Sequence, residues 1–226
     1  MLGILMLDTR FPRPPGDIGH PATFDFPVRR RVVAGAGPAA VVRGDDPALL
    51  APIIAAGEAL VREGAVALTT SCGFLARWQR ELAAALPVPV WTSSLLALAD
   101  LRGQHCGVLT IEAASLTAAH FEAVGADPAT PVEGIAPGSP LHRTLMEDLA
   151  TLDVDDAQVQ VLAAAARLRA RHPGLQALVL ECTNLPPYAP ALRAATGLPV
   201  HDIVTLLRGR MAARHDGTRA SGAARR

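Results

Sequence analysis

An internal repeat restricts the fold of this 226-residue chain more than any other feature of the sequence. The segment around Cys182 matches the segment around Cys72, which lies 110 positions earlier. The same offset aligns Gly64 with Gly174, Ala67-Leu68 with Ala177-Leu178, Leu75 with Leu185, Leu82 with Leu192 and Pro89-Val90 with Pro199-Val200. A repeat of this length predicts two related lobes and not a solenoid of short units.

Each copy of the repeat contains a short apolar run, then a cysteine, then residues that can open a helix. Short apolar runs of this kind are typical of strands that are buried on both faces of a parallel sheet. We therefore predict an α/β fold of two pseudo-symmetric lobes, each a mostly parallel sheet flanked by helices. Because ligands bind at the carboxyl ends of such strands, we expect the active site in the cleft between the lobes.

The same pattern gives the expected domain limits. We assign residues 1–97 to the first lobe and residues 98–201 to the second. A last helix over 202–213 could pack back on the first lobe. Residues 214–226 are rich in Gly, Ser, Ala and Arg, and we expect a frayed, disordered tail there.

Charge and hydropathy exclude several classes of partner. The formal net charge is zero, which argues against a nucleic-acid or anionic-membrane partner. The sequence has no apolar run long enough to cross a bilayer, and its first residues lack the basic region of a signal peptide. We therefore expect a cytoplasmic protein.

Cysteine and lysine usage restricts the chemistry. The three cysteines lack the spacing of a zinc site, so we expect no metal, and Cys106 is interpreted as a buried core thiol. All 21 basic residues are arginine. Without lysine there can be no pyridoxal-phosphate Schiff base, so we predict chemistry without a cofactor.

The two repeated cysteines are the candidate catalytic residues. Cys72 and Cys182 each stand where a strand passes into a helix, and helix N–H groups can lower a thiol pKa there. Two such thiols facing each other could remove a proton from a carbon beside a carboxylate and return one to its opposite face. The alternative is a pair of inert buried cysteines inherited by duplication.

A long loop over residues 8–29 leaves the same edge of the first sheet, and loops of this length are usually functional or disordered. Arg10 is our candidate clamp for a substrate carboxylate, because guanidinium binds carboxylate in a bidentate manner. Asp8 precedes it at the strand end. The alternative is that Arg10 and Arg13 are solvated surface charges.

The duplicated lobes and the paired cysteine motifs resemble the aspartate/glutamate/hydantoin racemase superfamily, over roughly residues 3–207. That group is cofactor-independent and also contains arylmalonate decarboxylase and maleate isomerase. The second motif, Cys182-Thr183-Asn184, follows the family pattern, and the resemblance implies that Thr183 and Asn184 bind the substrate. The first motif departs from it, because Gly73 and Phe74 stand where racemases have Asn and Thr. We expect Gly73 to contact the substrate, with Thr70 and Ser71 supplying the hydroxyls.

The resemblance favours a racemase or epimerase that acts at the α-carbon of a carboxylate compound, with Cys72 and Cys182 as the two bases. A related isomerase or decarboxylase is the first alternative. A non-catalytic protein that binds small acids is an alternative of another class. The expected partner is a small carboxylate substrate, and the resemblance implies a homodimer.

Overall fold

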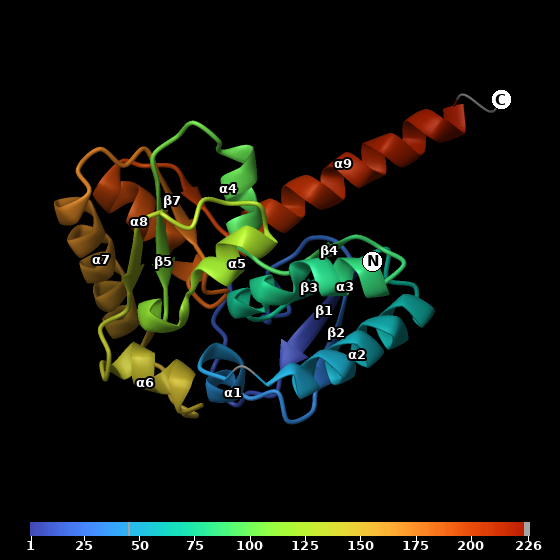
Figure 1. The fold of residues 1–226 in the computed structure, drawn as a ribbon, viewed down its shortest axis with the longest axis horizontal. Coiled ribbons are helices and arrows are strands. Elements are labelled where there is room, and N and C mark those ends of the chain that lie inside the picture. The colour runs from blue at the N-terminus through green and yellow to red at the C-terminus, as the bar shows by residue number, and fades with distance from the viewer. Residues whose placement is uncertain (45, 224–226) are drawn as a thin grey trace.

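A computed structural model describes residues 1–44 and 46–223. It contains two four-stranded sheets in which every neighbouring pair of strands is parallel, and Figure 1 shows the first sheet in blue to teal beside the second in green to red. The first has the order β2 (Val28–Val33), β1 (Leu2–Leu7), β3 (Ala67–Thr70), β4 (Val90–Trp91). The second has the order β6 (Val132–Gly134), β5 (Cys106–Thr110), β7 (Ala177–Leu180), β8 (Val200–His201). The matching order confirms the predicted pair of pseudo-symmetric α/β lobes.

Helices flank both sheets (Figure 1). The first lobe contains α1 (Pro38–Val42), η1 (Pro47–Leu49), α2 (Leu50–Arg62), η2 (Gly73–Trp78) and α3 (Gln79–Ala85). Two short elements, η3 (Ser94–Leu96) and α4 (Ala97–Asp100), join it to the second. The second lobe contains η4 (Ala113–Ser115), α5 (Ala118–Ala123), α6 (Pro140–Met146), α7 (Val154–Arg171), η5 (Pro186–Tyr188) and α8 (Ala189–Thr196). Asp153 is the N-cap of α7, where its carboxylate accepts from the Asp155 and Asp156 N–H groups.

The central strands are buried on both faces, as their apolar sequences require. Every residue of β1 and of β7 is buried. One apolar core runs through both lobes and includes Cys72 and Cys182, so the two cysteine motifs meet inside the molecule.

Helix α9 (Ile203–Ala223) begins against the first lobe and then extends away from the body (Figure 1). Ile203, Leu207 and Met211 pack in a cluster with Leu2 and Ile4 of β1. The helix is longer than we predicted and occupies residues 214–223 of the expected tail, which contain the helix-favouring residues Ala and Arg. Residues 224–226 of that tail lie outside the described residues.

In the part of the chain that the structure describes, no helix is both long and apolar enough to cross a membrane. The same residues contain no group of three or more His, Cys, Asp or Glu side chains arranged to hold a metal ion.

Candidate functional site

Cys72 and Cys182 line one pocket between the lobes. Cys72 follows β3 and is the N-cap of η2, and Cys182 follows β7 in the other sheet. The pocket has a volume of about 30 Å³ and is lined by Leu7, Phe11, Arg13, Pro38, Val42, Ser71, Cys72, Gly73, Phe74, Ile111, Leu145, Met146, Cys182, Thr183 and Asn184. Equivalent strand ends of the duplicated sheets thus bring the two thiols to one small, mostly apolar space.

Hydroxyl groups next to the cysteines bind the protein backbone. The Thr183 hydroxyl donates to the Ser71 carbonyl across the lobes at 2.6 Å, and the Ser71 hydroxyl accepts from the Leu7 N–H at 2.8 Å. The Thr70 hydroxyl lies 2.7 Å from the Thr92 carbonyl oxygen and 2.8 Å from that of Cys72. We predicted these residues as substrate contacts. In the structure their hydroxyls bond to backbone groups at the strand ends, because buried N–H and C=O groups need hydrogen-bond partners, and a substrate contact by these residues stays a prediction.

Gly73 packs against Glu181, the residue before the second cysteine. A Cβ atom at position 73 would collide with the backbone oxygen and the carboxyl Oε1 of Glu181. The sequence departs from the racemase pattern here because this close approach leaves no space for a side chain. Gly73 also lines the pocket, so packing against Glu181 explains why the residue is glycine and the predicted substrate contact stays a prediction.

Replacing Gly73 with alanine should therefore destabilise the fold by about 2–4 kcal/mol, since the Glu181 backbone cannot move away cheaply. Urea unfolding of the purified variant measures this change. The matched control is Gly174→Ala, because a Cβ atom added at Gly174 meets nothing within 4 Å. Equal stability of the two variants would contradict the packing argument.

Both thiols are buried deeply enough to remain protonated at neutral pH. Burial, followed by the Glu181 carboxyl, raises the pKa of Cys72 to about 12, although the Phe74 and Leu75 N–H groups oppose the shift. Burial likewise raises the pKa of Cys182 well above its usual value, and Glu181 adds to the effect. The backbone N–H groups after each cysteine act in the direction that we predicted, but the loss of water outweighs them, so the net shift of both pKa values is upward.

Glu181 is itself a buried carboxyl between the two motifs. The Thr110 hydroxyl donates to its Oε2 at 2.6 Å, while its Oε1 is buried without a partner. Burial raises the pKa of Glu181 to about 8, so this group is mostly neutral at pH 7.

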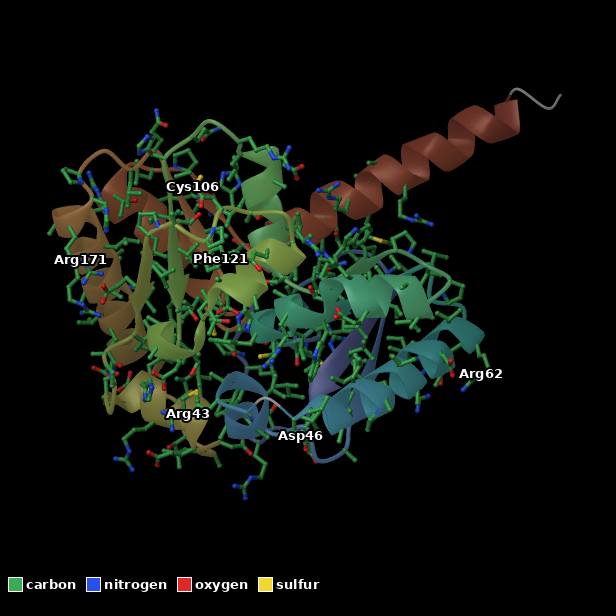
Figure 2. All side chains as sticks on the ribbon, viewed as in Figure 1. Arg43, Asp46, Arg62, Cys106, Phe121 and Arg171 are labelled. Atoms are coloured by element: carbon green, nitrogen blue, oxygen red, sulfur yellow. The ribbon has the colours of Figure 1, made fainter. Side chains whose placement is uncertain are left out.

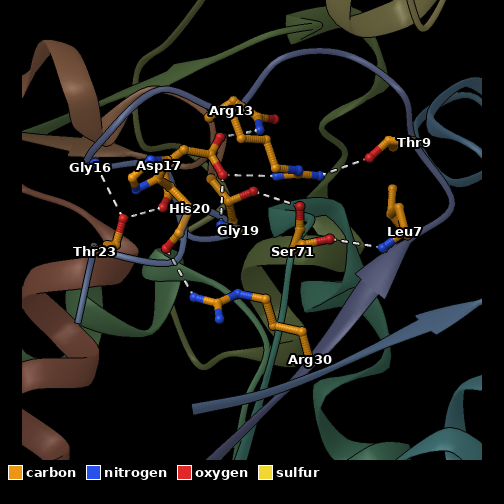
Figure 3. Close-up of polar contacts among 12 residues, drawn as sticks. Leu7, Thr9, Arg13, Gly16, Asp17, Gly19, His20, Thr23, Arg30 and Ser71 are labelled. Carbon is orange, nitrogen blue, oxygen red and sulfur yellow. Dashed lines mark hydrogen bonds and ion pairs between the residues drawn. The ribbon is translucent and has the colours of Figure 1, made fainter. Parts of the chain in front are cut away.

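Residues 8–27, here called the β1–β2 loop, supply the charged side of the pocket. The Arg13 guanidinium lines the pocket and donates to Asp17 at 2.9 Å and to Thr9 at 3.0 Å, as Figure 3 shows. It also lies over the Phe11 ring, 4.7 Å from the ring centroid. Further along the loop, Ile18 is fully buried in the cluster that contains the start of α9. The loop is therefore a packed wall of the site.

Arg10 and Asp8, which we predicted as substrate contacts, lie elsewhere. The Arg10 side chain is 78% exposed, and both its backbone N–H and its Nε donate to Asp148 in the other lobe. Asp8 is exposed, with its carboxylate 3.5 Å from the Gly35 N–H. Arg13, three residues further along the loop, is the arginine that lines the pocket.

Asn184 links the second thiol to the loop. The Cys182 thiol donates to Asn184 Oδ1 at 3.6 Å, and Asn184 Nδ2 donates to Asp17 Oδ2 at 2.6 Å. Asp17 is only 1% exposed. We left Asp17 unassigned from the sequence, and its one available signal was the spacing of four residues from Arg13, with which it forms an ion pair.

A larger cleft of about 970 Å³ lies away from the thiols, at the amino ends of β5 and β7. Cys106, labelled in Figure 2, lies at its edge as the first residue of β5 and is buried, as predicted. In open parallel sheets ligands collect at the carboxyl ends of strands, so we assign the functional site to the smaller pocket.

Sequence comparison relates the chain to enzymes that carry one name. No family model matches the chain. It is 30% identical over 225 residues to dimethylsulfoniopropionate lyase of Durusdinium sp. clade D, covering 90% of this chain and 71% of that protein. It is 29% identical over 243 residues to dimethylsulfoniopropionate lyase 7 of Emiliania huxleyi, covering 96% and 68%. For lyase 5 of the same organism the identity is 32%, covering 91% of this chain and 44% of the relative.

Solved structures relate the fold to racemases and a decarboxylase. Allantoin racemase from Klebsiella pneumoniae matches with a TM-score of 0.57 at 17% identity, covering 94% of this chain and 89% of that one. Glutamate racemase from Thermus thermophilus gives 0.54 at 22%, covering 95% and 80%. Arylmalonate decarboxylase gives 0.55 at 14%, covering 88% and 86%. The predicted resemblance to the aspartate/glutamate/hydantoin racemase superfamily is thus confirmed in the fold.

Proposed function

We propose, from the premise that the chain belongs to the dimethylsulfoniopropionate lyase family, that it is a lyase which cleaves this small sulfonium carboxylate. A lyase breaks its C–S bond by elimination. A base removes the proton on the carbon beside the carboxylate, the C–H electron pair forms the double bond, and the C–S pair leaves with sulfur. The products are acrylate and dimethyl sulfide, and the reaction needs neither oxidant nor cofactor.

The observation that carries the proposal, beside the family, is the pairing of a thiol with a guanidinium in one small apolar pocket. Arg13 is the charged residue among the pocket residues named above, and it suits the substrate carboxylate. Phe74, Ile111 and Met146 form an apolar wall that suits the methyl groups of a sulfonium, with Phe74 available for a cation–π contact.

We assign the base to Cys182. Hydrogen bonds connect its thiol through Asn184 and Asp17 to the Arg13 guanidinium. A carboxylate held by Arg13 would therefore present its neighbouring carbon on the side of the pocket where Cys182 lies. Charge that develops on the carboxylate as the proton leaves would be stabilised by the same guanidinium.

The test is incubation of the purified chain with dimethylsulfoniopropionate in heavy water, followed by proton NMR for acrylate and headspace gas chromatography for dimethyl sulfide. Both products should appear at equal rates. Absence of both, with a folded protein, would contradict the proposal. A homodimer and a cytoplasmic location stay predictions, and analytical ultracentrifugation would test the first.

A racemase or epimerase is the second candidate, favoured by the presence of two thiols from equivalent strand ends in one pocket. Elimination needs one base, whereas inversion at a carbon needs one on each face. Deuterium incorporated at the α-carbon of a chiral acid, with loss of optical activity and no acrylate, would favour this candidate over the lyase.

The raised thiol pKa values predict an alkaline pH profile. A base with a raised pKa is mostly protonated at pH 6, and its ionised fraction grows about tenfold per pH unit below that pKa. We expect kcat/KM for acrylate release to rise in this way from pH 6 to pH 8. Above pH 8 the rise should be less steep, because Glu181, with a pKa of about 8, then ionises and its negative charge opposes ionisation of the thiol. Initial rates in overlapping buffers measure the profile. A plateau below pH 7 would contradict a buried thiol as the base.

A further inference from the structure

We infer that Asp17 is a positioning residue: it fixes the side-chain amide of Asn184 so that the oxygen of that amide, and not the nitrogen, faces the Cys182 thiol. The inference rests on the proposed function only in treating Cys182 as the base. The geometry that supports it comes from the loop and from the second cysteine motif.

The Asp17 carboxylate determines which way the Asn184 amide points. A carboxylate only accepts hydrogen bonds, so the NH₂ group of Asn184 must face it. Asp17 Oδ2 accepts from that group at 2.6 Å, and Oδ1 accepts from Arg13 at 2.9 Å and from the Gly19 N–H at 2.6 Å. Because Asp17 is fully held by these donors, the amide oxygen of Asn184 is left to face Cys182.

An oxygen at this place favours the thiol and disfavours the thiolate. The amide oxygen accepts a hydrogen bond from the S–H group of the thiol, whereas an N–H group at the same place would donate a hydrogen bond to the ionised sulfur. The charged forms of Glu181, Cys72 and Asp17 act in the same direction on the pKa of Cys182, and the backbone N–H of Asn184 opposes them by donating to the sulfur. Tyr188 in η5 and Arg13 in the β1–β2 loop are the other ionisable groups around this thiol.

The arrangement has a chemical use. A proton on carbon is a weak acid, and a thiolate that binds protons more tightly is a stronger base toward it. Asp17 thus reduces the fraction of ionised Cys182 and increases the basicity of each thiolate that forms. Because Asp17 lies on the loop that carries Arg13, the base and the proposed carboxylate clamp are adjusted by one segment.

The experiment is the pH dependence of alkylation by iodoacetamide in the folded chain, with each cysteine quantified by peptide mass spectrometry. Asp17→Asn keeps the shape of the side chain but offers an NH₂ group to Asn184, which must then rotate and turn its own nitrogen toward Cys182. We expect alkylation of Cys182 at pH 8 to become about tenfold faster relative to Cys72, as one pKa unit implies. Asn184→Ala, which removes the oxygen together with the amide donor to Asp17, should shift the ratio in the same direction.

The control separates this effect from general loosening of the loop. Asp148→Gly releases the other end, where Asp148 Oδ1 accepts from the Arg10 and Phe11 N–H groups, and glycine suits the positive φ of 54° at that position. It should change the alkylation of both thiols to the same extent. An unchanged Cys182 to Cys72 ratio in Asp17→Asn, or an equal rise of that ratio in Asp148→Gly, would overturn the inference. Alkylation needs no substrate. A shifted Cys182 to Cys72 alkylation ratio in a chain that releases no acrylate would therefore contradict the proposed function and leave this inference standing.

Discussion

Serine in place of Cys182 is expected to reduce acrylate release from dimethylsulfoniopropionate by at least about a thousandfold, or roughly 4 kcal/mol of transition-state stabilisation. A hydroxyl is far less acidic than a thiol, so almost none of it is ionised at pH 8. The substitution exchanges the sulfur for an oxygen and leaves the Asn184 oxygen able to accept from the hydroxyl. Initial rates of acrylate formation, followed by NMR or chromatography at saturating substrate, measure the loss.

Two matched variants make this result specific. Cys106→Ser changes a buried cysteine at the opposite end of the second sheet, and it should leave kcat/KM within about twofold of the parent while lowering stability slightly. Cys72→Ser should lower kcat/KM about tenfold, because elimination requires one base and Cys72 then serves only to shape and polarise the pocket. Equal losses of a thousandfold or more in the Cys72 and Cys182 variants would instead point to two-base chemistry.

The duplicated fold could be predicted from the sequence because a repeat determines both the strands of each lobe and the place of those strands in each sheet. Aligned apolar runs dictate strands, and strands at the same place in two sheets end at the same edge. That reasoning was sufficient to bring Cys72 and Cys182 to one pocket. It could not give their ionisation, since the solvent exposure of a thiol depends on the whole packed core and not on the residues beside it.

The β1–β2 loop limited the prediction of the remaining site. A loop without periodicity gives no rule for which of its arginines points inward, and the prediction of Arg10 rests only on the ability of a guanidinium to bind a carboxylate. The structure pairs Arg10 with Asp148, which is distant in sequence, and places Arg13 against Asp17 and Phe11. Ion pairs of buried carboxylates such as Asp17 decide this arrangement, and they are set by tertiary contacts that a single sequence does not reveal.

The substrate class also needed more than residue patterns. The sequence alone favoured a racemase, whereas the relatives from Durusdinium and Emiliania huxleyi are lyases. Both reactions can begin with removal of a proton beside a carboxylate, so the same pair of cysteine motifs is compatible with either. The distinction depends on whether the next carbon carries a leaving group, which is a property of the substrate and of the apolar wall around Phe74.

Replacing Arg13 with glutamine is expected to lower kcat/KM for dimethylsulfoniopropionate by about a hundred- to a thousandfold, because the variant loses the charge that holds the carboxylate and stabilises its developing negative charge. Arg13→Lys keeps the charge but not the paired N–H donors, so it should retain more activity than Arg13→Gln. Steady-state kinetics measure both variants, and circular dichroism with thermal unfolding verifies that each is folded, since Asp17 loses its ion-pair partner in the glutamine variant.

The matched control is Arg10→Gln. Its guanidinium is exposed and bonds Asp148 outside the pocket, while the Arg10 and Phe11 N–H groups still hold that carboxylate. We expect Arg10→Gln to keep kcat/KM within about threefold of the parent, as is usual for exposed ion pairs. If Arg10→Gln instead caused the large loss and Arg13→Gln did not, the carboxylate would be bound at the strand end and the geometry of the pocket would have to be assigned again. A loss in Arg13→Gln that appears only in KM would mean that the guanidinium binds the substrate without stabilising the transition state.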